Sequence, residues 1–391
     1  MAKRRRKSGS RLHVALLVET SLASGRDILR GIARYVREHE PWSLYHEPRS
    51  LEESLPRWLR KWEGDGIIAR IQNQTMAAEA RATRIPTVDV LGVMSQKDFP
   101  LVHVDDEHVA RMAAGHLLER GFRHFGYFGI EGENWSGWRR EAFAQAVREA
   151  GFEVDVYELP RGRAGEGSWE AMEDELARWV AALPKPAGVM VCSAQRGAQF
   201  LEACRRAGAA VPDEVAVISV DNDEPLCEVC NPPLSSVDAG HVQVGYEAAA
   251  LLDRLLAGQA RPNRPILIQP QGVVTRGSTD VLAIEDRKIA LVLRLIREHA
   301  CNGIGVEALA RQAGLSRSVL QRRFRALLQR TVHQEILNVR IKRACELLAQ
   351  TDLPLVEIAE RTGFKHQEYM GAVFKARLRR TPAQYRRDAG G

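Results

Sequence analysis

Residues 314–330 read GLSRSVLQRRFRALLQR, a stretch with five arginines and no acidic residue. Its apolar residues recur at helical spacing, so Leu315, Val319, Leu320 and Phe324 can share one face of a helix. Most of the arginines then fall on the opposite face, and the stretch opens on a glycine, which suits a turn. The stretch therefore predicts an amphipathic helix that follows a turn and has a basic outer face.

A second copy of this pattern follows in the same tail. The segment VEALARQAGLSRSVLQRRFR (306–325) is echoed by LVEIAERTGFKHQEYMGAVFK (355–375) at an offset of 49, with one extra residue before the second phenylalanine. Each copy has a small alanine where two helices can cross, a glycine for the turn, and a second helix that begins with polar side chains. We therefore predict two helix-turn-helix units, near 306–325 and 355–375.

The second helix of each unit offers side chains suited to DNA. Arginine and glutamine bond guanine and adenine edges in the major groove, and further basic side chains bind phosphates. An exposed, solvated helix face is the alternative. The candidate DNA-binding residues are Arg317, Ser318, Gln321, Arg322 and Arg325 in the first unit and Lys365, His366, Gln367 and Lys375 in the second.

The tail resembles AraC-type DNA-binding domains along nearly its whole length. The phrase VFKARLRRTPAQYRR (373–387), with Pro382 and Tyr385, matches the family's closing signature. The resemblance implies that two helix-turn-helix units, joined by a helix around 333–349, enter successive major grooves. Ala372 stands where some relatives have an arginine, so we expect no base contact from this position.

The charge of the chain is unevenly distributed. From residue 287 to the end there are 21 basic and 9 acidic residues, a net charge of +12 within a formal total of +6. Residues 1–11 form a basic N-terminal tail with six positive charges, which leaves −12 for residues 12–286. This asymmetry predicts that the C-terminal part meets a polyanion and that the acidic body does not.

The body, residues 12–282, alternates short apolar runs with amphipathic stretches, which is typical of parallel sheets covered by helices. We expect the remainder, 283–391, to be an all-α domain. In parallel sheets, ligands bind beyond the carboxyl ends of the strands. The predicted strands lie at 12–19, 65–70, 87–92, 124–130, 187–193 and 214–221.

Polar and aromatic residues follow these strands, in a combination that suits a polyhydroxylated ligand. Aromatic faces pack on sugar rings, and arginine and aspartate bind vicinal hydroxyls. For each residue an ordinary loop or helix-start role is the alternative; Asp221, for example, could cap a helix. The candidate ligand-binding residues are Ser21, Arg70, Trp138, Arg139, Asp221 and Asn222.

Four phrases of the body resemble the periplasmic-binding-protein-like core of LacI-type sugar regulators: VDDEHVARMAAGHLLERGF (104–122), WRREAF (138–143), SVDNDE (219–224) and NPPLSSVD (231–238). The resemblance implies an α/β core of two lobes with the ligand between them, in contact with Arg139 and Asp221. Proteins of that type carry an N-terminal DNA-binding headpiece, and here the first strand begins near Leu12. We therefore expect DNA binding from the tail alone.

A LacI-type core placed ahead of an AraC-type tail resembles the arrangement in regulators of xylose operons. The resemblance implies a sugar-responsive transcription regulator, most often an activator, that acts as a homodimer with DNA, the sugar and RNA polymerase as partners. D-xylose is the effector it favours. It also implies an acidic group after the second strand, where this chain has Arg70. Another pentose, a polyol or a sugar acid therefore remains an alternative effector.

Other classes of protein find little support in the sequence. There is no nucleophile elbow and no glycine-rich phosphate loop, so a sugar-converting enzyme is a remote alternative. The pair in CEVC (227–230) supplies only two metal ligands, and HVDDEH (103–108) is explained by Asp105 capping a helix. We expect no metal and no cofactor. Since neither a bilayer-spanning apolar run nor a signal peptide is present, we expect a cytoplasmic protein without membrane contact.

Overall fold

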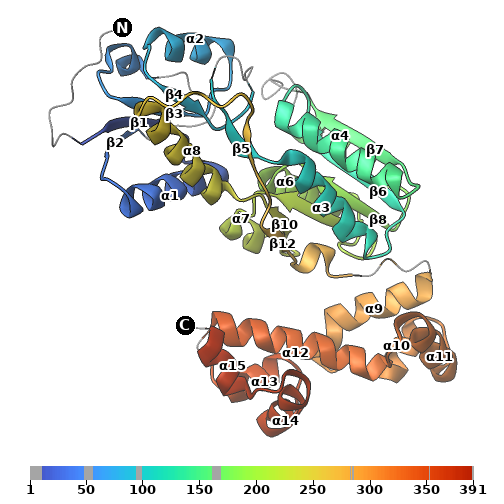
Figure 1. Ribbon diagram of the computed structural model, residues 1–391. Coiled ribbons are helices and arrows are strands. Elements are labelled where there is room, and N and C mark those ends of the chain that lie inside the picture. Colours follow the sequence, from blue (N-terminus) through green and yellow to red (C-terminus); the bar gives the residue numbers. More distant parts are fainter. Residues whose placement is uncertain are drawn as a thin grey trace. The chain divides into compact units, whose positions relative to one another are not determined.

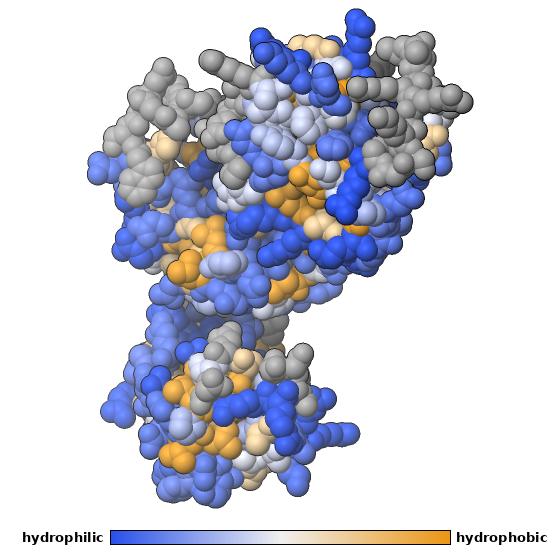
Figure 2. Space-filling view, turned by 90° about the vertical axis from the view of Figure 1, so that its left-hand side faces the viewer, coloured by the Kyte–Doolittle hydropathy of each residue, from blue (hydrophilic) through white to orange (hydrophobic). Residues whose placement is uncertain are grey.

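The computed structural model describes residues 11–47, 56–93, 99–160, 169–281, 283, 286–351 and 353–389. The chain forms two compact units with a boundary between residues 282 and 283. Each helix in the described ranges is too short or too polar to span a bilayer. On the face shown in Figure 2, hydrophilic residues predominate on both units, with smaller apolar areas between them.

The first lobe of unit 1 is built on a four-stranded parallel sheet in the order β2-β1-β3-β4. Helices α1 and α8 lie together on one side of this sheet and α2 on the other (Figure 1). The elements are β1 (His13–Leu17), α1 (Ala23–Glu38), β2 (Ser43–His46), η1 (Arg57–Lys61), β3 (Gly66–Ala69), α2 (Gln74–Ala82), β4 (Thr87–Asp89) and α8 (His241–Leu256).

Two glycines set the close packing of α1 on α8. A Cβ atom on Gly31 would lie 1.9 Å from the carbonyl oxygen of Val242, and one on Gly245 would lie 2.0 Å from that of Ile28. No larger residue fits at either position without moving a backbone. The approach of these two helices therefore depends on glycine.

The second lobe has a six-stranded sheet in the order β12-β10-β9-β8-β6-β7, parallel except for β12. Helices α3 and α4 cover one face and α6 the other (Figure 1), and α5 packs in one core with α6 through Leu176, Val180 and Phe200. The elements are α3 (Asp106–Leu118), β6 (His124–Ile130), α4 (Asn134–Glu149), β7 (Val154–Leu159), α5 (Trp169–Ala182), β8 (Ala187–Val191), α6 (Ala194–Arg206), β9 (Val215–Val220), α7 (Glu224–Val229), β10 (Ser235–Asp238), β12 (Gly272–Val274) and η2 (Gly277–Thr279).

The segments that cross between the lobes are hydrogen-bonded to one another. Strand β5 (Val102–Val104) pairs in parallel with β11 (Ile266–Ile268). At the end of this pair the amide of Asp105 donates to the carbonyl of Ile268 (2.8 Å), and the Gln269 side chain donates to the Asp105 carboxylate (2.9 Å). The amide of Gln271 donates to the carbonyl of Asp238, at the end of β10 (2.8 Å). The crossing segments are thus connected to one another, and we call them the hinge: β5 with Asp105, the end of β10 at Asp238, and β11 with Gln269 and Gln271.

The predicted strands and fold class are confirmed. All six predicted strands are present, as β1, β3, β4, β6, β8 and β9. Asp105 caps α3 as predicted, its carboxylate accepting from the amide of His108 (3.1 Å). The sequence did not predict β2, β5, β7, β10, β11 or β12, which are short or partly exposed and lack a continuous apolar run.

Unit 2 is all-helical, with two cores that share one long helix. The first half of α12 contributes Val332 and Ile336 to a core around Phe324, and its second half contributes Ile341 and Leu348 to a core around Phe374. The elements are α9 (Arg287–His299), η3 (Ala300–Asn302), α10 (Val306–Gln312), α11 (Arg317–Leu328), α12 (Val332–Gln350), α13 (Leu355–Arg361), α14 (Gln367–Leu378) and α15 (Pro382–Ala389).

The internal repeat extends further than the sequence comparison indicated. Thr331 and Gln334 exchange hydrogen bonds of 2.8 and 3.1 Å at the start of α12, and Thr381 and Gln384 do the same at the start of α15 (2.8 and 3.2 Å). Such reciprocal bonds form a capping box. Each repeat is therefore a unit of three helices, α10–α12 and α13–α15.

Candidate functional site

Arg139 is the centre of a buried polar cluster in the second lobe. It lies on α4, is 3% exposed, and donates to the Asp106 carboxylate (Nε–Oδ1, 2.7 Å) and the Cys192 carbonyl (2.6 Å). A further nitrogen lies 3.6 Å from Asp221 Oδ1, and the guanidinium lies over the Trp135 ring at 5.2 Å. Burial opposes its charge, but the two carboxylates outweigh burial and raise the pKa of Arg139.

Asp106 links Arg139 to the hinge. It is the first residue of α3, where a carboxylate also meets the positive end of the helix dipole. Its second oxygen lies 3.1 Å from Nε2 of His103 on β5. Burial raises the pKa of Asp106, but Arg139 and His103 more than compensate and hold that pKa below its ordinary value.

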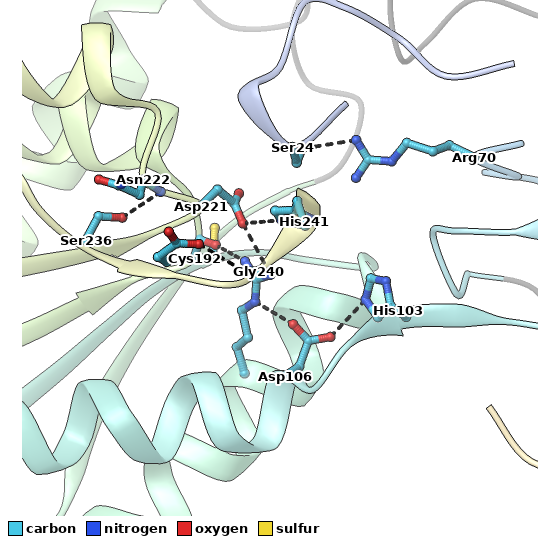
Figure 3. Close-up of polar contacts among 12 residues, drawn as sticks. Ser24, Arg70, His103, Asp106, Cys192, Asp221, Asn222, Ser236, Gly240 and His241 are labelled. Carbon is cyan, nitrogen blue, oxygen red and sulfur yellow. Dashed lines mark hydrogen bonds and ion pairs between the residues drawn. The ribbon is translucent and has the colours of Figure 1, made fainter. Parts of the chain in front are cut away.

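Asp221 follows β9 with a backbone that only glycine adopts readily. Its φ is +83° and that of Asn222 is +45°, so two successive residues occupy a conformation that costs energy at non-glycine positions. His241, at the start of α8, lies 3.0 Å from Asp221 Oδ1 (Figure 3). Burial acts to raise the pKa of Asp221, but Arg139, His241 and Arg70 lower it to about 2. Strain and an ionised buried carboxylate in one place are typical of a binding site.

The first lobe contributes a second buried ion pair, Glu19 with Arg70. Glu19 is 1% and Arg70 8% exposed, and Nη1 of Arg70 donates to Glu19 Oε1 and to the Ser24 hydroxyl (3.1 Å; Figure 3). Glu19 Oε2 and Arg70 Nε are buried without a hydrogen-bond partner among the described residues. These two atoms can accept and donate a hydrogen bond to a ligand.

Three of the predicted ligand-binding residues come together. Arg139 and Asp221 lie 3.6 Å apart, and the charge of Arg70 on the other lobe is near enough to contribute to lowering the pKa of Asp221. We give the name interlobe cluster to the buried charged and imidazole side chains at this place: Glu19, Arg70, His103, Asp106, Arg139, Asp221 and His241.

The other predicted ligand-binding residues lie at its margin or elsewhere. Trp138 is 41% exposed, with its ring centre 6.2 Å from that of His103. Asn222 donates from its amide to Ser236 and accepts from Arg276 (2.9 Å). Ser21 is exposed and its carbonyl accepts a hydrogen bond from Arg26 (3.0 Å), whereas the buried hydroxyl near the cluster is that of Ser24, in the first turn of α1.

Sequence reasoning missed four charged or imidazole members of the cluster. Glu19 lies two residues after the end of β1, a position that could have singled it out. His103, Asp106 and His241 lie at the crossings, and no local pattern indicates which crossing residues meet. In the described ranges no three His, Cys, Asp or Glu side chains are arranged to hold a metal ion.

In unit 2 the predicted recognition helices present their polar faces outward. Helix α11 follows Gly314 (φ +59°) and α14 follows Gly363 (φ +75°), and both buried phenylalanines face the core. Arg317 forms an ion pair with Glu307 (2.6 Å), whereas Arg323 forms an ion pair with Asp286, the N-cap residue of α9. The residues predicted to bind DNA are all exposed: Arg317, Ser318, Gln321, Arg322, Arg325, Lys365, His366, Gln367 and Lys375.

The two recognition helices differ in what they expose. The extra residue of the second copy lies in its turn, between Gly363 and the cap residue His366, so the two helices match at an offset of 50. Gly371 and Ala372 then stand where α11 has Gln321 and Arg322, and Glu368 corresponds to Ser318. The middle of α14 therefore lacks long hydrogen-bonding side chains.

Comparison with known proteins agrees with both units. Residues 13–108 match the XylR N-terminal domain, 114–279 a periplasmic binding protein-like domain, and 309–388 a helix-turn-helix domain. The chain is 32% identical over 381 residues to the xylose operon regulatory protein of Haemophilus influenzae, covering 95% of this chain and 97% of that protein. The chain belongs to the family of xylose operon regulatory proteins.

Further members and structures support this assignment. The xylose operon regulatory protein of Escherichia coli K12 is 31% identical over 386 residues, covering 96% of this chain and 97% of that protein. A solved structure of the xylose-binding transcription activator XylR is 29% identical, with a TM-score of 0.82 over 98% of this chain and 100% of that one. A LacI-type regulator from Alkaliphilus metalliredigens, 19% identical with a TM-score of 0.54 over 68% of this chain and 98% of that one, shares the fold of the body alone.

Proposed function

We propose that this member of the xylose operon regulatory family is a transcription factor that binds operator DNA through α11 and α14 and binds D-xylose at the interlobe cluster. One observation carries the proposal: the same chain holds a cluster of buried charges between two lobes and two outward-facing recognition helices. A regulator needs both a site for a signal and a site for DNA.

The interlobe cluster has the chemistry of a sugar site. Carboxylates, guanidinium groups and imidazoles from both lobes converge there, and each can bond a hydroxyl. Trp138 and Trp135 lie beside it and offer faces on which a sugar ring can pack. The name of the solved relative, a xylose-binding activator, favours D-xylose as the effector and activation as the response.

Switching requires that the sugar bind one arrangement of the lobes more tightly than another. The cluster provides this difference, because its members lie on both lobes and on the crossings between them. Arg26 on α1 also bonds Asp223 before α7, across the lobes (3.2 Å). A ligand that bonds both lobes at once therefore favours the closed arrangement.

The regulator acts as a homodimer in the cytoplasm, where DNA is available, and recruits RNA polymerase. Closed two-fold dimers present two DNA-binding units, which suits paired operator sites. The enzyme alternative has no support, since the relatives that match the whole chain are named as regulatory proteins.

The proposal is tested by measuring both activities of the full-length protein. All seven tryptophans precede residue 180, so their fluorescence reports on unit 1 alone. We expect D-xylose to change this fluorescence and to alter the retardation of promoter DNA from the regulator's own operon. DNA retardation without a response to any sugar would contradict the proposed sugar site. Absence of DNA affinity at low salt would contradict the proposed DNA binding. Sedimentation of the full-length protein tests the dimer.

A further inference from the structure

We propose that Glu19 and Arg70 together recognise two adjacent hydroxyl groups of an uncharged sugar and exclude sugar acids from the site. This inference rests on the proposed function, since it concerns the ligand of the same interlobe cluster. It assigns a ligand-binding role to Glu19 and decides between the neutral and acidic effectors that the sequence left open.

The burial of the pair is the first argument. Each side chain uses one polar atom for the hydrogen bond between them, Arg70 Nη1 to Glu19 Oε1. Each also has one buried polar atom, Glu19 Oε2 and Arg70 Nε, without a hydrogen-bond partner among the described residues. A buried polar atom left unpaired costs about 1–3 kcal/mol. Such atoms are rare in folded proteins, and a ligand that satisfies them accounts for their presence.

The two free atoms match a pair of neighbouring hydroxyls. A carboxylate oxygen only accepts hydrogen bonds and a guanidinium N–H only donates, whereas each sugar hydroxyl can do both. One hydroxyl can therefore donate to Glu19 Oε2 while its neighbour accepts from Arg70 Nε. Gly25 leaves room for the carboxylate, since a Cβ there would lie 2.5 Å from Glu19 Oε1 and 2.0 Å from the Glu19 carbonyl oxygen.

Charge decides against an acidic ligand. The carboxylates of Glu19, Asp106 and Asp221 outnumber the guanidinium groups of Arg70 and Arg139, and each guanidinium group is already paired with a carboxylate. Arg70 alone would attract a ligand carboxylate, but Glu19 already neutralises it. A carboxylate brought into this buried site would add a like charge where water cannot screen it.

The influence of Arg70 reaches across the cluster. It contributes to lowering the pKa of Asp221, on the other lobe, after the larger effects of Arg139 and His241. Removing the charge of Glu19 would therefore change the electrostatic potential across the whole cluster and also remove one hydrogen bond. A purely structural Glu19 would affect stability but not the ranking of neutral against acidic ligands.

The test is calorimetric titration of the full-length protein with D-xylose, xylitol and D-xylonate. Two variants separate the roles of Glu19: Glu19→Gln removes the charge at constant size, and Glu19→Asp keeps the charge but withdraws it from the ligand. Glu38→Gln is the matched control, a carboxylate of the same lobe that pairs with Arg34 on the exposed side of α1. Melting temperature and DNA retardation verify that each variant is folded.

We expect the unmodified protein and Glu38→Gln to bind D-xylose and to show no heat with D-xylonate. Both Glu19 variants should weaken D-xylose binding by about 10- to 100-fold, as expected when a hydrogen bond to a charged group is lost. Only Glu19→Gln should reduce the ratio of the affinity for D-xylose to the affinity for D-xylonate. Binding of D-xylonate by the unmodified protein as tightly as D-xylose, or unchanged preference in Glu19→Gln, would overturn the inference and leave the regulator intact. Failure of every sugar to bind would instead overturn the proposed effector site.

Discussion

Arg139 on α4 and Asp106 at the start of α3 form an ion pair of 2.7 Å that is almost closed to solvent, with both side chains 3% exposed. The pair joins the helix that follows β6 to the helix that begins at the hinge. Asp106 also bonds His103 on β5, so Arg139 is linked to the crossing segments by a single intervening residue. A ligand that contacts Arg139 would therefore be coupled to the hinge through Asp106.

Replacing Arg139 by alanine should abolish the sugar response while DNA affinity remains measurable. The variant leaves Asp106 and Asp221 without their main cation, and breaking a buried pair in this way costs about 3–5 kcal/mol. Tryptophan fluorescence should show a less stable unit 1 that no longer responds to D-xylose. Arg140→Ala is the control, since Arg140 pairs with Glu158 (2.6 Å) outside the cluster. A normal sugar response in Arg139→Ala would remove Arg139 from the site.

The stability of unit 1 should fall as the pH is lowered from 6.5 towards 4. Burial, with a smaller effect of Arg120, lowers the pKa of His116 to about 4. The unfolded chain then binds a proton that the folded chain resists, which costs on the order of 2 kcal/mol between pH 6.5 and 5. Asp221 contributes only at lower pH, where stability is lost as the pH falls from 3.8 to 2.

Urea unfolding at pH 7 and pH 5, followed by tryptophan fluorescence, measures this effect of His116. His116→Gln can keep the hydrogen bond to Thr279 Oγ1 (2.8 Å) but cannot titrate, so it should lose less stability between the two pH values. His124→Gln, at the exposed start of β6, should behave as the unmodified protein does. An equal pH dependence in all three proteins would contradict the assignment.

Replacing Arg322 by alanine should weaken operator binding by about 1–3 kcal/mol and relax the preference at one base pair. Arg322 is exposed on α11, where an arginine can bond a guanine edge. Fluorescence anisotropy at fixed salt with single-base operator variants measures both effects. Arg343→Ala on α12, where Arg343 pairs with Glu346 (2.9 Å), is the control. A uniform loss across all sequences would assign Arg322 to a phosphate instead.

The half of the operator that meets α14 should tolerate base changes better than the half that meets α11. Gly371 and Ala372 replace the glutamine and arginine of α11, so fewer side chains reach base edges. Introducing the missing side chain with Ala372→Arg should add a base preference in that half. Equal sensitivity of both halves in the unmodified protein, measured over a complete set of single-base operator variants, would rule out this asymmetry.

Both units were predictable in outline because their signals are local. Apolar runs and helical periods involve residues close together in the sequence, so six strands and both helix-turn-helix units could be predicted from the residues that form them. The correspondence of Glu368 with Ser318 could not be predicted from the sequence. The turn glycines of the two copies match at an offset of 49, whereas the helices that follow match at an offset of 50. Only the helix caps, Ser316 and His366, show where the extra residue lies.

The sequence by itself determined that an acidic α/β body precedes a basic helical domain, and which residues end the strands of the body. The tertiary structure decided which of these residues meet. Asp106 and His241 reach Arg139 and Asp221 because the chain crosses between the lobes beside them, over separations of 33 and 20 residues. Glu19 meets Arg70 over 51 residues because β1 and β3 are neighbours in one sheet. A contact between distant segments depends on strand order and on the crossings, and neither leaves a local pattern in the sequence.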